Sequence, residues 1–215
     1  MSNKLIVGFV LLVLIAIPSF SQTTVKYDTV MQVNKNLPNY GFIINETKNE
    51  YNQRSYLINI YRTDSNSLLQ TIDLSKYDYW YGVYDAPYID TLIDVNFDGY
   101  CDLPVVVGIG QNGKNWDYQI FFFNKSDGNF YKKKNFPGIN NISVDESSKQ
   151  IHESFWTGCL DCIIWNTYII ENDELILVEK DYQEIDDKTH ELRRFVERYK
   201  NGKLVSKEEL KPVLD

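Results

Sequence analysis

The sequence predicts an all-β protein, an antiparallel meander packed as a single β-sandwich-like domain. Segments rich in Ile, Val, Tyr and Phe are separated by clusters of Asn, Asp, Ser and Gly, as in a series of strands and turns. No sequence unit recurs at a regular interval, which argues against a propeller or solenoid. The expected strands are Tyr40–Asn45, Arg54–Arg62, Leu68–Leu74, Tyr88–Asp94, Leu103–Ile109, Trp116–Phe123, Cys162–Ile170 and Glu174–Tyr182.

Within these segments, Arg54–Arg62 shows the alternation of a half-buried strand, because Tyr56, Ile58 and Ile60 alternate with other residues. Three pairs predict hairpin turns, since Asn, Asp and Gly tolerate positive φ. They are Asp127-Gly128, Asn172-Asp173 and Asn201-Gly202.

Residues 188–200 fit two structures. The apolar residues Leu192, Phe195, Val196 and Tyr199 have the spacing of an amphipathic helix. The same residues also fit a strand that enters the Asn201-Gly202 turn, and we favour this hairpin because it continues the meander.

Residues 1–21 have the pattern of a signal peptide. Lys4 precedes the apolar segment 5–17, and small residues at Ser19 and Ser21 precede an expected cut before Gln22. The apolar segment is short for a hydrocarbon core of about 30 Å, so an uncleaved membrane anchor is only the alternative. We therefore expect a periplasmic or secreted protein with one domain, 22–215, and no membrane attachment after cleavage.

The formal net charge is −8. Nucleic-acid binding requires basic side chains that displace condensed counterions, so the sequence argues against a nucleic-acid partner. An acidic surface suits calcium or a cationic protein partner.

Residues 94–102 have the spacing of a calcium loop. Ca²⁺ prefers six to eight oxygen ligands, and such loops place side-chain oxygens at positions 1, 3, 5 and 9, a backbone carbonyl at 7 and a glycine at 6. Gly99 occupies position 6, and position 12 is Val105, so the loop is not an EF-hand. We expect it to connect two strands and to bind calcium through Asp94, Asn96, Asp98, Tyr100 and Asp102.

Two loops are candidate partner-binding surfaces, because exposed aromatic rings give contact area at low entropic cost. The first is the aromatic run 77–88, with Tyr79, Trp80, Tyr81 and Tyr84. Packing of these rings into the core is the alternative. The second is the polar loop 108–116, with Asn112, Lys114, Asn115 and Trp116.

The chain contains three cysteines. In an exported chain, Cys159 and Cys162 indicate a small disulfide, because the residues that follow continue as a strand rather than as the helix of a redox motif. Zinc would need a second ligand pair, which the spacing does not offer. We expect Cys101 to be a buried thiol, with a disulfide to one of the other two as the alternative.

The sequence contains few signatures of catalysis. His152 and His190 lie in no nucleophile or zinc pattern. A pair of catalytic carboxylates cannot be located among the many acids, so an unrecognised hydrolase is an alternative to a non-catalytic protein.

Residues 93–100 together with Asp102-Leu103, Tyr118–Asn124 and Asp127–Phe130 resemble a family of exported bacterial calcium-loop β proteins. The family is typified by the periplasmic immunity protein that protects type IV-secreting bacteria from a lysozyme-like effector. The sequence is also similar to periplasmic inhibitors of invertebrate-type lysozyme, and the loop is similar to the calcium hairpins of integrin-type FG-GAP repeats. The resemblance covers residues 88–130.

This resemblance implies a β-sandwich-like fold, a structural calcium at 94–102 and a loop that plugs the cleft of a peptidoglycan hydrolase. We therefore expect an exported, non-catalytic calcium-binding protein with a protein partner, of which a lysozyme-like hydrolase is the leading example. The alternative from another class is a surface glycan-binding module that uses Trp80 and the tyrosines around it.

Overall fold

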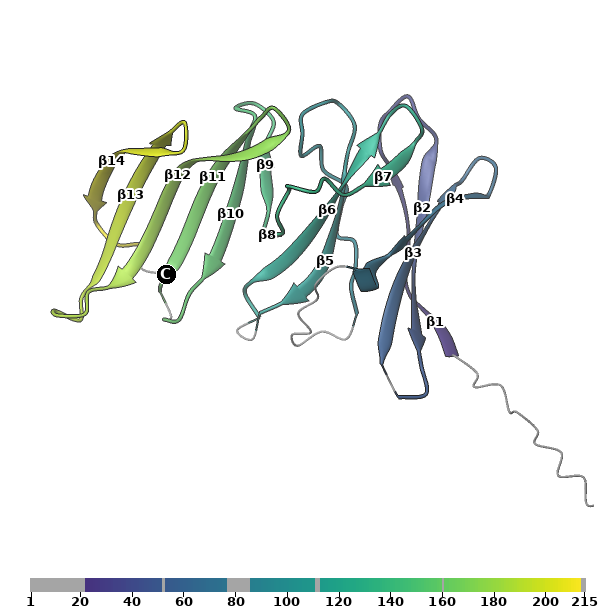
Figure 1. The fold of residues 1–215 in the computed structure, drawn as a ribbon, viewed down its shortest axis with the longest axis horizontal. Helices are drawn as coiled ribbons and strands as arrows, with labels where there is room; N and C mark the ends of the chain where they lie inside the picture. The colour runs from purple at the N-terminus through teal and green to yellow at the C-terminus, as the bar shows by residue number, and fades with distance from the viewer. Residues whose placement is uncertain (1–21, 52, 77–85, 111–112, 160, 214–215) are drawn as a thin grey trace, which may run out of the picture.

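The computed structural model describes residues 22–51, 53–76, 86–110, 113–159 and 161–213, and Figure 1 shows their arrangement. The described residues form antiparallel strands and one short 3-10 helix, η1 (Leu74–Lys76), which confirms the all-β prediction. The expected signal peptide, residues 1–21, lies outside the described residues. The strands are β1 (Gln22–Gln32), β2 (Asn39–Lys48), β3 (Arg54–Arg62), β4 (Ser67–Asp73), β5 (Leu103–Ile109), β6 (Trp116–Asn124), β7 (Asn129–Tyr131), β8 (Ile139–Asn140), β9 (Ser143–Asp145), β10 (Gln150–Trp156), β11 (Ile163–Glu171), β12 (Glu174–Ile185), β13 (Leu192–Lys200) and β14 (Lys203–Leu210).

The first sheet is a meander in the order β1-β2-β3-β4. In β3, Tyr56, Ile58 and Ile60 are buried while the residues between them are partly exposed, as the alternation predicts. Ile58 lies opposite Ile44 of β2 and Ile72 of β4, so apolar side chains of three strands share one face.

The second sheet has the order β5-β6-β7, with β8 paired to β6. Its buried side chains pack with those of the first sheet in one core, in which Phe130 of β7 lies edge-on against Phe42 of β2 at 5.8 Å between ring centres. Two sheets that share a core in this way form the expected β-sandwich.

Strand β6 contributes to two cores because its side chains alternate between two covered faces. Phe121 and Phe123 belong to the core shared with the first sheet. Ile120 and Phe122 belong to a second core with Val95 and residues of the third sheet, such as Ile151. A strand covered on both faces explains the uninterrupted apolar run 120–123.

The third sheet has the order β14-β13-β12-β11-β10-β9 and forms one end of the elongated molecule in Figure 1. Most side chains of β12 are partly exposed, and those of β14 are almost all exposed. The outer strands therefore extend the meander beyond the two cores.

The three predicted hairpin turns are confirmed. Gly128, Asn172, Asp173, Asn201 and Gly202 all have positive φ. Residues 192–210 form the β13–β14 hairpin, so the strand prediction for this segment is confirmed and the helix alternative is wrong.

The prediction of a continuous strand over Tyr88–Asp94 is wrong. This segment forms only two isolated bridges, Tyr88 with Val106 and Ile93 with Asp102. Between these bridges, the Tyr27 hydroxyl of β1 donates to the carbonyl oxygen of Ile89. A side chain therefore occupies a carbonyl that would accept a backbone N–H group in a paired strand. Strands β1 and β10 are the longer strands absent from the prediction.

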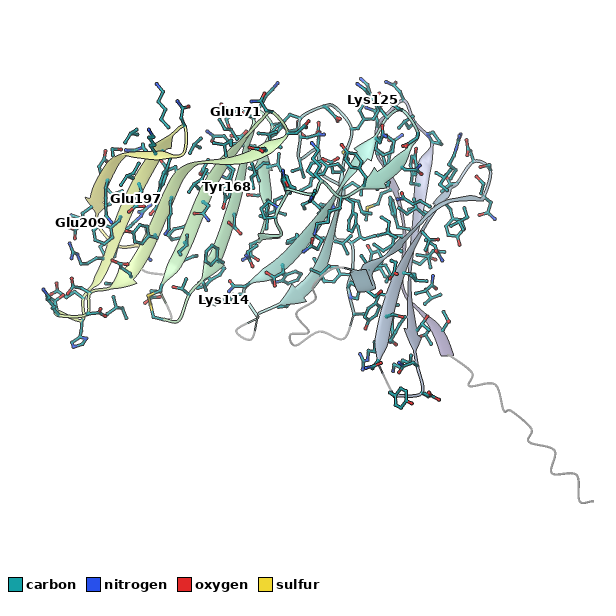
Figure 2. All side chains as sticks on the ribbon, viewed as in Figure 1. Lys114, Lys125, Tyr168, Glu171, Glu197 and Glu209 are labelled. Carbon is teal, nitrogen blue, oxygen red and sulfur yellow. A yellow bond between two sulfur atoms is a disulfide. The ribbon has the colours of Figure 1, made fainter. Side chains whose placement is uncertain are left out.

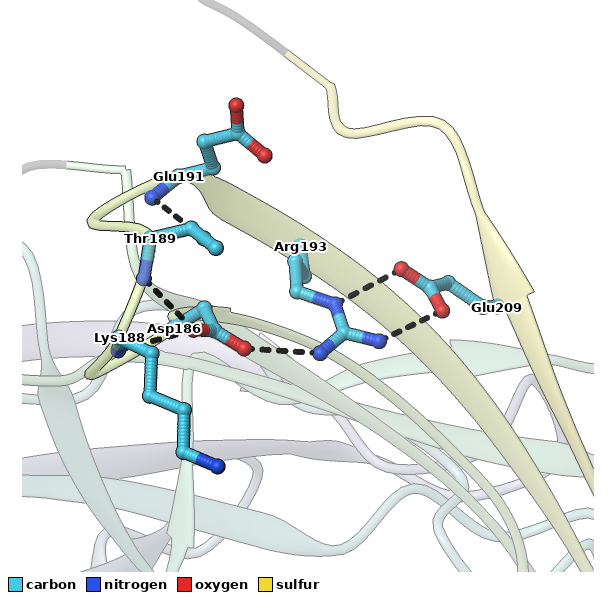
Figure 3. A network of polar contacts seen from close by, with 6 residues as sticks. All are labelled: Asp186, Lys188, Thr189, Glu191, Arg193 and Glu209. Carbon is cyan, nitrogen blue, oxygen red and sulfur yellow. Dashed lines mark hydrogen bonds and ion pairs between the residues drawn. The ribbon is translucent and has the colours of Figure 1, made fainter.

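A polar network closes the β12–β13 turn (Figure 3). The Asp186 carboxylate accepts the N–H groups of Lys188 and Thr189, both at 2.9 Å, and a hydrogen bond from Arg193. Arg193 also forms a bidentate pair with Glu209 of β14. The N–H groups of Thr189 and Lys188, followed by the Arg193 guanidinium, lower the pKa of Asp186 to about 2.

This pKa predicts how the stability of the hairpin depends on pH. The folded-state pKa lies below the ordinary value of 3.8, so the stabilising effect is complete above that value and is lost as the pH falls towards about 2. We expect Asp186→Asn to lower the urea midpoint at pH 7 and to differ less from the unmodified protein as the pH approaches 3. The neighbouring Asp187→Asn serves as control, and an equal midpoint shift at both pH values would contradict the assignment.

Candidate functional site

Loop 94–102 forms a series of turns in which side-chain oxygens accept successive backbone N–H groups. Asp94 accepts from Asp98 at 3.1 Å and from Gly99 at 2.8 Å. Asn96 Oδ1 accepts from Asp98 at 3.3 Å, and Asp98 Oδ1 accepts from Tyr100 at 3.0 Å. The side chains at positions 1, 3 and 5 therefore lie on the inner side of one tight turn.

Two residues of this loop have left-handed backbone conformations, Phe97 with φ of 59° and Gly99 with φ of 87°. A Cβ at Gly99 would meet no atom within 4 Å, so a side chain would have room there. The glycine is needed for its positive φ, which other L-residues adopt at a cost.

Asp102 is fully buried and links the loop to the second sheet. Its Oδ2 accepts the Val95 N–H and its Oδ1 accepts the Phe123 N–H of β6, both at 2.9 Å. Burial raises the pKa of Asp102 to about 7, although these two N–H groups act to lower it. The charges of Asp98 and Asp94 also raise it, so the three carboxylates interact.

The other two carboxylates, those of Asp94 and Asp98, belong to the same tight turn. Burial raises the pKa of Asp94, and the charge of Asp98 raises it further. The backbone N–H groups that Asp94 accepts act in the opposite direction. Among the described residues, neither Asp94 nor Asp98 forms an ion pair. Two carboxylates, one amide oxygen and the Tyr100 carbonyl are hard oxygen donors, the set that calcium prefers.

This donor set contains fewer carboxylates than the sequence pattern implies. Within the part of the chain that the structure describes, no three His, Cys, Asp or Glu side chains are arranged to hold a metal ion. Both oxygens of Asp102 accept backbone N–H groups, as those of Asp94 do, but Asp102 is fully buried whereas Asp94 is partly exposed.

The β1–β2 turn holds the other side of the loop. Asn34 Nδ2 donates to the Gly99 carbonyl at 2.6 Å, and the Cys101 N–H donates to the Val33 carbonyl at 2.8 Å. The Tyr100 ring stacks on Phe123 at 5.6 Å. Cys101 is a partly buried free thiol, and burial raises its pKa.

Loop 108–116 lies at the other end of β5, which separates it from loop 94–102 by seven residues. A strand of this length spans about 20 Å. The two loops therefore lie apart, because each is attached to a different end of the same strand. Lys114 and Lys125 mark the two ends of β6 in Figure 2.

Two asparagines hold loop 108–116 against the third sheet. Asn115 donates to the Trp156 carbonyl at 2.9 Å and accepts the Trp156 N–H at 2.7 Å. Asn141 donates to the carbonyls of Lys114 and Ser154 at 2.9 and 2.8 Å and accepts the Trp116 N–H at 3.0 Å. Residues 114–116 of the loop are thus fixed between β6 and β10.

The aromatic side chains at this end include Trp116, whose ring lies edge-on to Tyr88 at 5.6 Å. Lys114 Nζ lies 5.0 Å from the centre of the Trp156 ring. The candidate residues Tyr79, Trp80, Tyr81, Tyr84 and Asn112 lie outside the described residues.

The disulfide between Cys159 and Cys162 is confirmed. It closes the β10–β11 hairpin, where the Thr157 N–H donates to the Cys162 carbonyl at 2.8 Å. Gln183 of β12 donates to the Asp161 carbonyl at 2.8 Å, so the hairpin is also bonded to the next strand.

Asn141 and Trp156 are absent from the residues proposed on the sequence. Asn141 has a φ of 42°, and the pair Asn140-Asn141 was the available turn signal. Trp156 lies just before the disulfide hairpin, but no local pattern places it beside Lys114.

No family model matches the sequence, and no curated protein matches it. A solved structure titled "Structure of a Xanthomonas Type IV Secretion System related protein" superposes with a TM-score of 0.43 at 16% identity. The superposition covers 90% of this chain and 93% of that chain. No helix among the described residues is long and apolar enough to cross a membrane.

The bonds of Asn141 predict a measurable contribution to stability. Asn141→Gly keeps the positive φ and removes the three side-chain bonds, so we expect a loss of about 1–3 kcal/mol in the free energy of unfolding. Asn201→Gly is the matched control, because Asn201 has a φ of 52° in an exposed turn. Equal urea midpoints for the two variants would contradict the role of Asn141.

Proposed function

We propose that this chain is an exported, non-catalytic binding protein that is stabilised by calcium and holds a protein partner through loop 108–116. The observation that carries the proposal is the anchoring of this loop by Asn115 and Asn141. Residues 114–116, which are held by these side-chain bonds, lose little conformational freedom when a partner binds, which favours affinity. The disulfide between Cys159 and Cys162 supports an oxidising compartment.

Calcium in this proposal is structural. Asp94, Asn96 and Asp98 would supply side-chain oxygens and Tyr100 its carbonyl. Asp102, the buried last residue of the loop, would add a further negative charge. Bound calcium would supply the positive charge that the interacting carboxylates lack among the described residues. Asp102 and the β1–β2 turn connect this loop to both sheets of the sandwich.

The partner we propose is a lysozyme-like peptidoglycan hydrolase. The resemblance of residues 88–130 to the calcium-loop family motivates this choice. The net charge of −8 favours association with a cationic enzyme, because long-range attraction raises the rate of encounter. The exposed Lys114 and the partly exposed Trp116 belong to the proposed contact surface.

Calcium binding is tested by thermal and urea unfolding with calcium or chelator. A site with a Kd on the order of 10⁻⁴ to 10⁻³ M would stabilise the fold by about 1 to 2 kcal/mol at millimolar calcium. We expect Asp98→Asn to abolish this shift. Asp127→Asn, a turn carboxylate that likewise precedes a glycine, should keep it. An unmodified protein that is indifferent to calcium would contradict the metal site.

The partner is tested by titrating residues 22–215 into a panel of lysozyme types in a turbidity assay. We expect inhibition of at least one type, and a loss of affinity on the order of ten-fold in Lys114→Ala, the scale of a strong interface contact. Lys125→Ala, at the opposite end of β6, is the matched control (Figure 2). No inhibition across the panel, or an equal loss in both variants, would overturn this partner or this surface.

A further inference from the structure

The β10–β11 end of the third sheet carries two tryptophans on the same face. Trp165 lies opposite Ser154, and Trp156 lies opposite Ile163. Directly opposed residues of an antiparallel pair point to the same side, and so do residues two apart in one strand. Trp156 and Trp165 also line one small hollow, together with Gln183 of β12, which places the two rings close together.

Both indoles are partly exposed, although Ile163 and Gln183, which line the same hollow, are buried. The strands β11 to β14 pack chiefly against neighbours in their own sheet. The C-terminal segment reaches the edge of the hollow, where the Val213 N–H donates to Gln183. Among the described residues, no other strand or helix covers the two tryptophans.

Each ring is approached by a cation on a flexible side chain. Lys114 Nζ lies 5.0 Å from the Trp156 ring centre, and the Arg194 guanidinium lies 5.9 Å from that of Trp165. Such contacts use the negative potential of the ring face. The C–H groups on one face of a sugar ring carry a small positive charge and fit the same potential.

Hydrogen-bonding side chains lie beside Trp165. Ser154 supplies a hydroxyl opposite Trp165. Asp181, also opposite Trp165 on β12, forms a bidentate pair with Arg194. Flat aromatic faces bordered by hydroxyl, carboxylate and guanidinium groups match a ligand that has one apolar face and a polar rim.

We infer that the face formed by Trp156 and Trp165 is a binding site for an oligosaccharide, whose pyranose rings stack on the two indoles. This site is independent of the calcium loop. It borders the proposed partner surface only through Lys114, which contacts Trp156. The chain would then bind a glycan of the cell envelope on one face while loop 108–116 remains the protein contact.

The test is an NMR titration that follows the four tryptophan indole N–H signals of the chain. The probes are the tetrasaccharide of N-acetylglucosamine, cellotetraose and solubilised cell-wall polysaccharide, each with and without calcium. We expect saturable shifts of the Trp156 and Trp165 signals with at least one probe, and none of the Trp116 signal. Trp165→Ala should weaken binding on the order of ten-fold, the scale of one stacking contact.

Two further variants separate binding from folding. Trp165→Phe retains an aromatic ring and should retain most of the affinity even if Trp165→Ala is unstable. Tyr131→Ala removes an exposed aromatic side chain elsewhere and should change nothing. No saturable shift with any of the three probes, or equal affinity in Trp165→Ala and Tyr131→Ala, would overturn the inference.

Failure of the glycan site is distinguishable from failure of the proposed function. Trp165→Ala should inhibit a susceptible hydrolase as the unmodified protein does, because Trp165 does not belong to loop 108–116. A loss of inhibition in this variant, measured on folded protein, would show that the face serves the protein partner and would overturn an independent glycan site.

Discussion

A single buried carboxylate, Asp102, accepts hydrogen bonds from two backbone amides that lie far apart in the chain, those of Val95 and Phe123. Val95 belongs to the core that the second sheet shares with the third, whereas Phe123 belongs to the core shared with the first. Removal of this carboxylate would leave two buried N–H groups without their acceptor, which costs about 1–3 kcal/mol for each. The start of loop 94–102 is therefore tied to the strand on which both cores depend.

Strand β6 explains why this link matters for the rest of the molecule. Its side chains alternate between the two cores, so a displacement of β6 would disturb both. One end of β6 meets Asp102, and the other end carries Trp116 and the anchored loop 108–116. In our proposal, calcium acts on partner binding by stabilising this strand and its neighbours, not by direct contact with the partner.

Much of the fold was predictable because its signals are local. Period-two alternation identified β3, and the residues that tolerate positive φ identified three hairpins. The turn geometry of Asp94, Asn96 and Asp98 follows from their spacing, because each side chain accepts the N–H group of a residue that follows it shortly in the sequence. The strand predicted over Tyr88–Asp94 was wrong because its local pattern does not include a distant contact. The Tyr27 hydroxyl, 62 residues away in the sequence, donates to the Ile89 carbonyl.

The candidate site was predictable only in part for a similar reason. The role of Asp102 as a buried acceptor depends on the N–H group of Phe123, which lies outside the loop and is not part of its spacing pattern. Asn141 and Trp156 acquire their roles from contacts with loop 108–116, at sequence separations of 25 and 41 residues. Such contacts arise from tertiary packing, which neither propensity nor periodicity encodes.

Amide hydrogen exchange at Val95 and Phe123 tests the central role of Asp102 most directly. Our account predicts that both amides exchange as slowly as those in the middle of β6, and that calcium slows the Val95 amide further while leaving the exposed β13–β14 turn unchanged. Exchange at Val95 as fast as in that turn, with no response to calcium, would contradict both the buried link and its coupling to the metal loop.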